Sequence, residues 1–150
     1  MSEPRIDYAH FAQMATDARK ALTALGAAVD AMGVDKGLTE LIKLRASQIN
    51  GCAFCIGFHL NLARKIGVDP RKLDLVAAWR EAGVYSEREM AALAWTEALT
   101  LTPGTGGTDD LYANLLTQFS REEALALTID IGTINQWNRI AAGLRFTPPA

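Results

Sequence analysis

The two cysteines of the chain, Cys52 and Cys55, stand three positions apart, and His59 follows four positions after the second. On a helix these three positions share a face, so both sulfurs and the imidazole would lie together. A helix N-terminus stabilises a thiolate, and a nearby imidazole can accept the thiol proton. Once one thiol is oxidised, the second can condense with it to give a disulfide and water. The spacing therefore predicts a redox couple, with Cys55 as the favoured first nucleophile because His59 is one turn away.

The same spacing predicts a bridge that is easily reduced. Helical neighbours three apart have Cβ atoms about 5–6 Å apart, whereas a relaxed disulfide requires roughly 3.5–4.5 Å. Closing the bridge must tighten the first turn of the helix. A bond of this kind suits a catalyst better than a structural crosslink.

Zinc binding is an open alternative. Cys52, Cys55 and His59 are three suitable ligands. A fourth is hard to find, because His10 is the other histidine of the chain and Glu40 would be unusual in a structural site. Such a protein would be a zinc-binding or redox-sensing module without turnover.

Three further interpretations of the cysteine motif carry less weight. The two cysteines could simply be small buried hydrophobic residues, although the histidine in phase with them argues against it. Covalent haem attachment requires a histidine directly after the second cysteine, and Ile56 stands there. A thioredoxin-like domain requires a strand before the motif, and no alternating pattern typical of a strand precedes it.

Composition indicates an ordinary soluble globular protein. Of the 150 residues, 49% are hydrophobic and 21% are charged, and the formal net charge is −2. This charge predicts neither a nucleic-acid partner nor a membrane partner. No signal peptide or membrane-spanning run is recognisable, and two cysteines are too few for a disulfide-rich secreted scaffold. We therefore expect a cytoplasmic protein, and nothing in the sequence predicts a cofactor.

Apolar spacing of three and four residues predicts a single all-α domain over residues 1–150, with about seven helices and the Cys-x-x-Cys pair at the N-terminus of a central one. Asp69-Pro70 is typical of a helix start, and Ser86 to Glu89 and Ser120 to Glu123 are capping boxes. Residues 102–107 form the clearest predicted loop. The expected helices cover residues 7–32, 38–50, 52–67, 69–83, 86–101, 108–119 and 120–142. Since the last helix is apolar on most sides, one side is expected to be covered by another subunit.

Residues 40–55, Glu-Leu-Ile-Lys-Leu-Arg-Ala-Ser-Gln-Ile-Asn-Gly-Cys-Ala-Phe-Cys, are followed by His59 and Arg64. This combination resembles the signature of the AhpD-like alkylhydroperoxidases, within the carboxymuconolactone decarboxylase superfamily. Residues 79–99 and 134–140 resemble the same family, so the likeness covers most of the chain. It implies an all-α AhpD-like fold that assembles as a homotrimer or homohexamer.

The resemblance implies an antioxidant peroxidase, an oxidoreductase that reduces hydroperoxides through a redox-active disulfide. Cys55 would be the peroxidatic cysteine and Cys52 the resolving one, with His59 and Glu40 relaying the proton of Cys55. A lipoylated protein or another dithiol protein would reduce the disulfide. AhpD carries a histidine where this chain has Phe54. Decarboxylases and lactonase-type members of the superfamily are an alternative, but the decarboxylases generally lack the cysteine pair.

Overall fold

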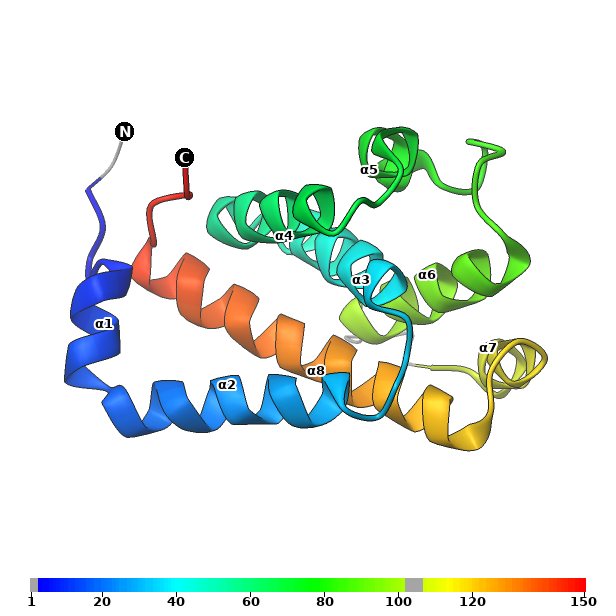
Figure 1. Ribbon diagram of the computed structural model, residues 1–150, viewed down its shortest axis with the longest axis horizontal. Coiled ribbons are helices and arrows are strands. Elements are labelled where there is room, and N and C mark those ends of the chain that lie inside the picture. Colours follow the sequence, from blue (N-terminus) through cyan, green and yellow to red (C-terminus); the bar gives the residue numbers. More distant parts are fainter. Residues whose placement is uncertain (1–2, 102–106) are drawn as a thin grey trace.

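The computed structural model describes residues 3–101 and 107–150, and in these ranges every regular element is a helix (Figure 1). The all-α prediction is confirmed, whereas most of the predicted loop, residues 102–106, lies outside the described residues. None of the described helices is long and apolar enough to cross a membrane. The elements are α1 (Tyr8–Met14), α2 (Thr16–Asp30), α3 (Lys36–Ile49), α4 (Ala53–Lys65), α5 (Pro70–Leu75), the 3-10 helix η1 (Val76–Ala78), α6 (Glu87–Thr100), α7 (Asp109–Leu116) and α8 (Arg121–Leu144).

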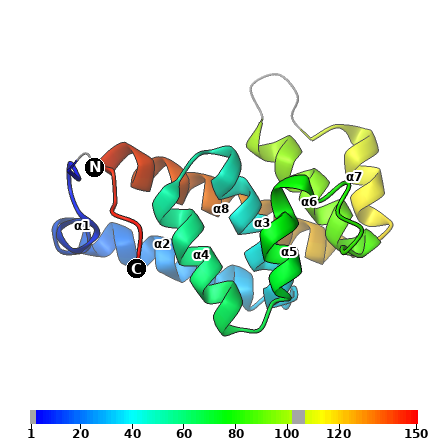
Figure 2. The same cartoon turned by 90° about the horizontal axis from the view of Figure 1, so that it is seen from above.

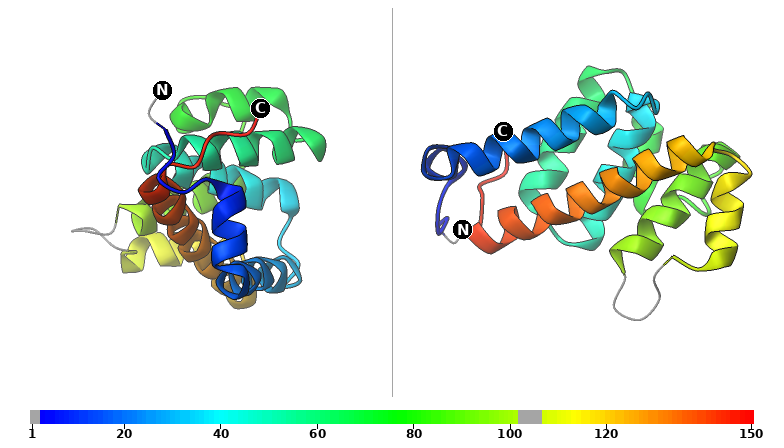
Figure 3. Two further views of the ribbon diagram at one scale, coloured as in Figure 1. Left: turned by 90° about the vertical axis from the view of Figure 1, so that its left-hand side faces the viewer. Right: turned by 90° about the horizontal axis from the view of Figure 1, so that it is seen from below.

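The long helix α8 organises the packing, since it contacts α2, α3, α4, α6 and α7. Figure 1 shows α2 along one side of α8, with α3 and α4 on the other. Seen from above, α4 lies in front of α8 (Figure 2), and from below α2 and α8 run alongside each other (Figure 3). Both α2 and α4 therefore pack against α8, although the three helices are far apart in the sequence.

Local capping signals set several helix starts. Both predicted capping boxes form, with the Ser86 and Ser120 hydroxyls accepting from the backbone N–H groups of Glu89 and Glu123 and both glutamates reaching back. Asp69 caps α5, with proline in its first turn. These starts agree with the sequence because each cap depends only on residues within one turn.

The helix predicted over residues 7–32 is in fact two helices, which brings the α-helices of the described residues to eight. The chain leaves helical geometry at Ala15 (φ −124°, ψ 45°). Thr16 donates its hydroxyl to the carbonyls of Ala12 and Gln13, which satisfies the end of α1. The break lets Phe11 pack against Phe146 while α2 follows α8. The predicted helix over residues 69–83 also ends early, because α5 gives way to η1 after Leu75.

The turn between α3 and α4 presents the cysteine pair. Gly51 has φ 64°, a left-handed conformation that glycine adopts without a Cβ clash. Cys52 follows as the N-cap of α4, and its Sγ accepts a hydrogen bond from the backbone N–H of Cys55 at 3.2 Å. The pair therefore sits at the start of a central helix, as the sequence predicted.

Three amide side chains hold this turn against α8. The Asn50 amide donates to Oδ1 of Asn135 at 2.9 Å and to Oδ1 of Asn138 at 2.8 Å. Asn138 is only 1% exposed and donates in turn to the Ser47 hydroxyl at 3.0 Å. Buried amides are stable only when paired, so this network fixes where α4 begins relative to α8.

Candidate active site

The cysteine pair is oxidised. Cys52 and Cys55 form a disulfide, with their Cα atoms 5.3 Å apart, and both residues are buried. They belong to a small core cluster that includes Phe11, Ile134 and Phe146. The predicted pairing of the two sulfurs is thus present, at the N-terminus of α4.

His59 lies one turn further along α4 and bonds to a buried carboxylate of α3. Its Nδ1 is 2.6 Å from Oε2 of Glu40, whose side chain is 0% exposed. An ionised carboxylate can only accept, so Nδ1 carries the hydrogen in this pair. When the imidazole is neutral, this tautomer leaves Nε2 free to accept a proton.

Glu40 is kept ionised by its surroundings. Its Oε1 is 3.1 Å from Nζ of Lys36 and 3.6 Å from Nζ of Lys43. Burial raises the pKa of Glu40, but the hydrogen bond from His59 and the charges of His59, Lys43 and Lys36 outweigh it. Together they lower the pKa from 4.5 to about 2. The carboxylate is therefore a permanent negative charge behind the imidazole at neutral pH.

Lys43 links this pair to a second buried acid, Asp130 of α8. Its Nζ is 3.3 Å from Oδ1 of Asp130, a residue only 1% exposed. Burial raises the pKa of Asp130, and the attraction of Lys43 offsets only part of that increase. Apart from this ion pair, neither carboxylate oxygen has a hydrogen-bond partner in the part of the chain that the structure describes. The charged side chains thus run in one line from His59 through Glu40 and Lys43 to Asp130.

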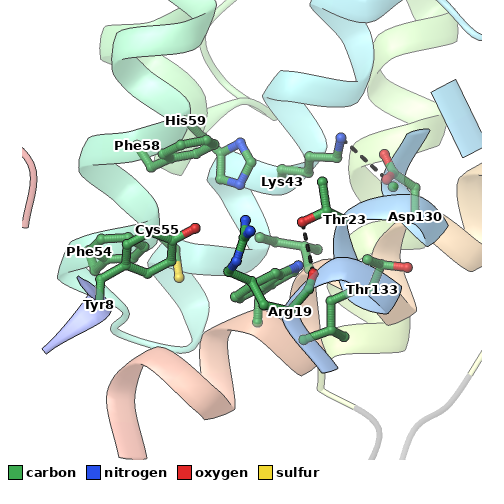
Figure 4. A pocket seen from close by; sticks show the side chains of 14 residues that line it. Tyr8, Arg19, Thr23, Lys43, Phe54, Cys55, Phe58, His59, Asp130 and Thr133 are labelled. Carbon is green, nitrogen blue, oxygen red and sulfur yellow. Dashed lines mark hydrogen bonds and ion pairs between the residues drawn. The ribbon is translucent and has the colours of Figure 1, made fainter. Parts of the chain in front are cut away.

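A cavity of about 530 Å³ opens beside this line (Figure 4). It is lined by residues of α1, α2, α3, α4 and α8, and Cys55 and His59 are among them, whereas Cys52 is not. Arg19, Lys43 and Asp130 supply its charged groups. Its apolar wall is formed by Tyr8, Leu22, Phe54, Phe58, Ile134 and Trp137. A volume of this size is typical of sites for small molecules, and it brings them to Cys55.

Phe54 belongs to the aromatic wall of the cavity. Its ring stacks on Tyr8 at 5.5 Å and on Phe58 at 6.4 Å, and meets the Phe146 ring edge-on at 5.2 Å. A phenyl ring carries no titratable group, so it cannot take part in proton transfer. At the position where AhpD has a histidine, this chain therefore has an apolar contact surface.

The structure brings the four predicted residues into one region and adds charged groups that the sequence analysis did not identify. Lys36 and Lys43 lie four residues before and three residues after Glu40, a helical spacing that could have revealed them. Asp130 had a weaker signal, a single carboxylate between Ile129 and Ile131 in an apolar helix. Arg19 had none, because only tertiary packing brings α2 to the cysteine helix.

The zinc alternative lacks a ligand set. Over residues 3–101 and 107–150, no group of three or more histidine, cysteine, aspartate or glutamate side chains is arranged to hold a metal ion. The disulfide uses both sulfurs, and the Nδ1 of His59 is bonded to Glu40.

Comparison with known proteins places this site in a family context. Residues 16–98 match the model of the carboxymuconolactone decarboxylase family. The uncharacterized protein YdfG of Bacillus subtilis (strain 168) is 40% identical over 111 residues, which are 74% of this chain and 76% of that protein. The crystal structure of ATU0492 from Agrobacterium tumefaciens, a protein of unknown function assigned provisionally to antioxidant defence as AhpD, superimposes with a TM-score of 0.92. Its sequence is 42% identical, and the match covers 99% of both chains.

A more distant likeness concerns the fold alone. The debrominase Bmp8 superimposes with a TM-score of 0.83 at 23% identity, over 92% of this chain and 74% of that one. The eight described α-helices thus adopt an AhpD-like fold, which Bmp8 shares although only 23% of its sequence is identical.

Proposed function

The chain belongs to the carboxymuconolactone decarboxylase family, and from this premise we propose that it is a thiol-dependent peroxidase. In this proposal Cys55 attacks the hydroperoxide and Cys52 resolves the oxidised product. His59 and Glu40 relay the proton. The similarity to ATU0492, which is 42% identical over 99% of both chains and is assigned provisionally to AhpD, supports this proposal.

One observation carries the proposal. The disulfide joins a sulfur that lines a cavity, Cys55, to one that does not, Cys52, and the cavity also holds the imidazole of His59. A buried, ionised Glu40 orients that imidazole through Nδ1. A nucleophile, a base and a group that orients the base are the parts that activated cysteine chemistry requires.

In the first step, the reduced Cys55 thiol gives its proton to Nε2 of His59. The thiolate attacks one oxygen of the hydroperoxide, so that an S–O bond forms and the O–O bond breaks. Two electrons pass from sulfur to the departing alkoxide, which takes the proton from His59 and leaves as an alcohol. Cys55 is now a sulfenic acid. Glu40 stabilises the imidazolium that forms between the two proton transfers.

In the second step, the Cys52 sulfur attacks the sulfur of the sulfenic acid. The S–S bond forms, the S–O bond breaks, and hydroxide leaves as water with the Cys52 proton. As the N-cap of α4, Cys52 receives the N–H of Cys55 and the positive end of the helix dipole, both of which favour its thiolate. A dithiol then supplies two electrons and two protons to restore both thiols.

The reductant and the assembly belong to the same proposal. A lipoylated protein or another dithiol protein would reduce the disulfide in the cytoplasm. A homotrimer or homohexamer would cover apolar side chains that α8 leaves in solvent, such as Leu125, which is 54% exposed. Association would bury this surface by the hydrophobic effect.

A thiol titration tests the proposal directly. The reduced protein has two thiols, and one equivalent of cumene hydroperoxide is expected to consume both while releasing one equivalent of the alcohol. Addition of dithiothreitol should restore both thiols, and excess hydroperoxide should then be turned over. Thiols that remain titratable after the hydroperoxide has been added would refute the peroxidase function.

Replacing His59 by alanine is expected to shift the pH profile of Cys55 alkylation upward by roughly one pH unit, because the thiol then lacks its proton acceptor. Near neutral pH the alkylation rate should fall about tenfold. Iodoacetamide alkylation of reduced Cys52→Ser protein, with and without His59→Ala, isolates this effect on Cys55. An unchanged profile would exclude His59 from the relay.

A further inference from the structure

Arg19 is a charged side chain of the cavity that is not paired with any acidic side chain of residues 3–101 and 107–150. It lines the cavity from α2, and Figure 4 shows its side chain between Cys55 and Thr23 in that view. Its Nε is buried and has no hydrogen-bond partner. No ion pair of the described residues includes it.

Other partly buried arginines of the chain are paired. Arg45 Nε lies 2.9 Å from Oε1 of Glu97, and Arg88 Nη2 lies 2.6 Å from Oε1 of Glu123. Removing a guanidinium from water is unfavourable unless an anion compensates it. Arg19 is partly buried and is paired with no anionic side chain of the described residues, so its guanidinium is available to an anionic ligand in the cavity.

The other cationic side chains of the cavity are already paired with carboxylates. The Lys43 ammonium has Asp130 at 3.3 Å, Glu40 at 3.6 Å and Asp30 at 3.9 Å. His59 has Glu40 at 2.6 Å. Arg19 is left as the cation of the cavity that forms no ion pair with the described residues, and one such cation suits a monoanion. A phosphate dianion would need a second free cation in the cavity.

The planar guanidinium of Arg19 and the aromatic lining of the cavity indicate which class of monoanion would bind. A guanidinium offers a planar fork of donors that a carboxylate can accept in bidentate fashion. The rings of Tyr8, Phe54, Phe58 and Trp137 line the same cavity and would cover an apolar body. The cavity thus combines one anion-binding group with an aromatic wall, next to the redox sulfur.

We propose that the substrate of this site carries a carboxylate, which Arg19 binds, on an apolar body that lies against the aromatic wall. This inference rests on the proposed function, in which the hydroperoxide group of that molecule reacts with Cys55. The balanced chemistry is that of the peroxidase steps above, with the carboxylate unchanged throughout. The substrate class is thereby narrowed to hydroperoxides of apolar carboxylic acids.

Binding of an unreactive acid tests the subsite without any turnover. We expect the disulfide form to bind 4-phenylbutyrate roughly tenfold or more tightly than the neutral 4-phenylbutanamide, measured by titration calorimetry. Arg19→Gln should abolish this preference. Lys20→Gln makes the same charge change at the next, exposed position of α2, outside the cavity, and should retain it. Equal binding of acid and amide, or a preference that survives in Arg19→Gln, would overturn the proposal.

Turnover separates substrate binding from activation of the cysteine. The substrates are a fatty-acid hydroperoxide and its methyl ester, and the quantity compared is the ratio of their kcat/KM values. Arg19→Gln should lower this ratio about tenfold, chiefly through KM for the acid. If Arg19→Gln lowers both kcat/KM values by the same factor, the ratio does not change. Arg19 would then act on Cys55 and not on the carboxylate, and the proposal would be overturned.

The two proposals can fail separately. If hydroperoxides leave both thiols of the wild type titratable but the acid–amide preference depends on Arg19, the peroxidase function is wrong and the carboxylate subsite stands. If both thiols are consumed but the preference is absent, the carboxylate subsite is wrong and the peroxidase function stands.

Discussion

Replacing Cys55 by serine is expected to lower peroxide turnover by at least about a thousandfold, because the hydroxyl cannot be oxidised and is a far weaker nucleophile at neutral pH. Cys52→Ser is the matched control, since it makes the same sulfur-to-oxygen replacement in the other cysteine of the disulfide. It should also lose steady-state turnover with a dithiol. However, it should still react once, and Cys55 should gain one oxygen.

Mass spectrometry of each variant after one equivalent of hydroperoxide distinguishes the two roles. The Cys52→Ser protein should gain one oxygen atom on Cys55, whereas the Cys55→Ser protein should remain unmodified. The opposite result would make Cys52 the nucleophile. There is a physical case for that result, because the backbone N–H of Cys55 bonds to Cys52 Sγ. The assignment to Cys55 was predicted from its spacing to His59, and it is now also supported by access, since Cys55 lines the cavity and Cys52 does not.

The parts of the fold that were predictable from sequence are those fixed by local chemistry. Ser86, Ser120 and Asp69 each cap a helix through atoms within one turn, and all three starts are confirmed. The break at Ala15 was missed because the apolar spacing continues across it. What separates α1 from α2 there is the packing of Phe11 against Phe146, a contact across most of the chain.

The residues of the candidate site also fall into those that local sequence could predict and those that it could not. Cys55 and His59 are one turn apart on α4, so helical geometry alone places them on one face, and Cys52 caps the start of the same helix. Glu40 is nineteen residues before His59 on another helix, and the family resemblance rather than the spacing identified it. Arg19 and Asp130 reach the cavity from α2 and α8, through helix packing that no local pattern specifies. The charges that distinguish this site were therefore the part least accessible from sequence.

Glu40→Gln is expected to lower the free energy of unfolding at pH 7 by on the order of 3 kcal/mol. The pKa of Glu40 is about 2 in the folded chain, against an ordinary value of 4.5. A lowered pKa means that the ionised form stabilises the fold. This contribution is complete above pH 4.5 and is lost as the pH falls toward 2. The stability difference between wild type and variant should therefore shrink over that window.

Urea denaturation of both proteins between pH 7 and pH 2.5 measures this difference, and acid effects common to both cancel. Glu81→Gln is the matched control, because Glu81 is exposed and forms no ion pair among the described residues. It should change the free energy of unfolding by no more than about 0.5 kcal/mol. A constant difference for Glu40→Gln across the window would mean that packing, and not charge, is lost.

The same variant also tests whether Glu40 serves the fold or the relay. Its carboxylate pairs with Lys36 and Lys43 as well as with His59, so a loss of stability alone would fit a purely structural ion cluster. A relay adds a second requirement, because an amide cannot stabilise the imidazolium as a carboxylate does. In a Cys52→Ser background, Glu40→Gln should therefore shift Cys55 alkylation to higher pH, in the same direction as His59→Ala. In the double variant the two shifts should not add, because both act through one imidazole. Fully additive shifts would separate Glu40 from His59 and leave it as a structural charge.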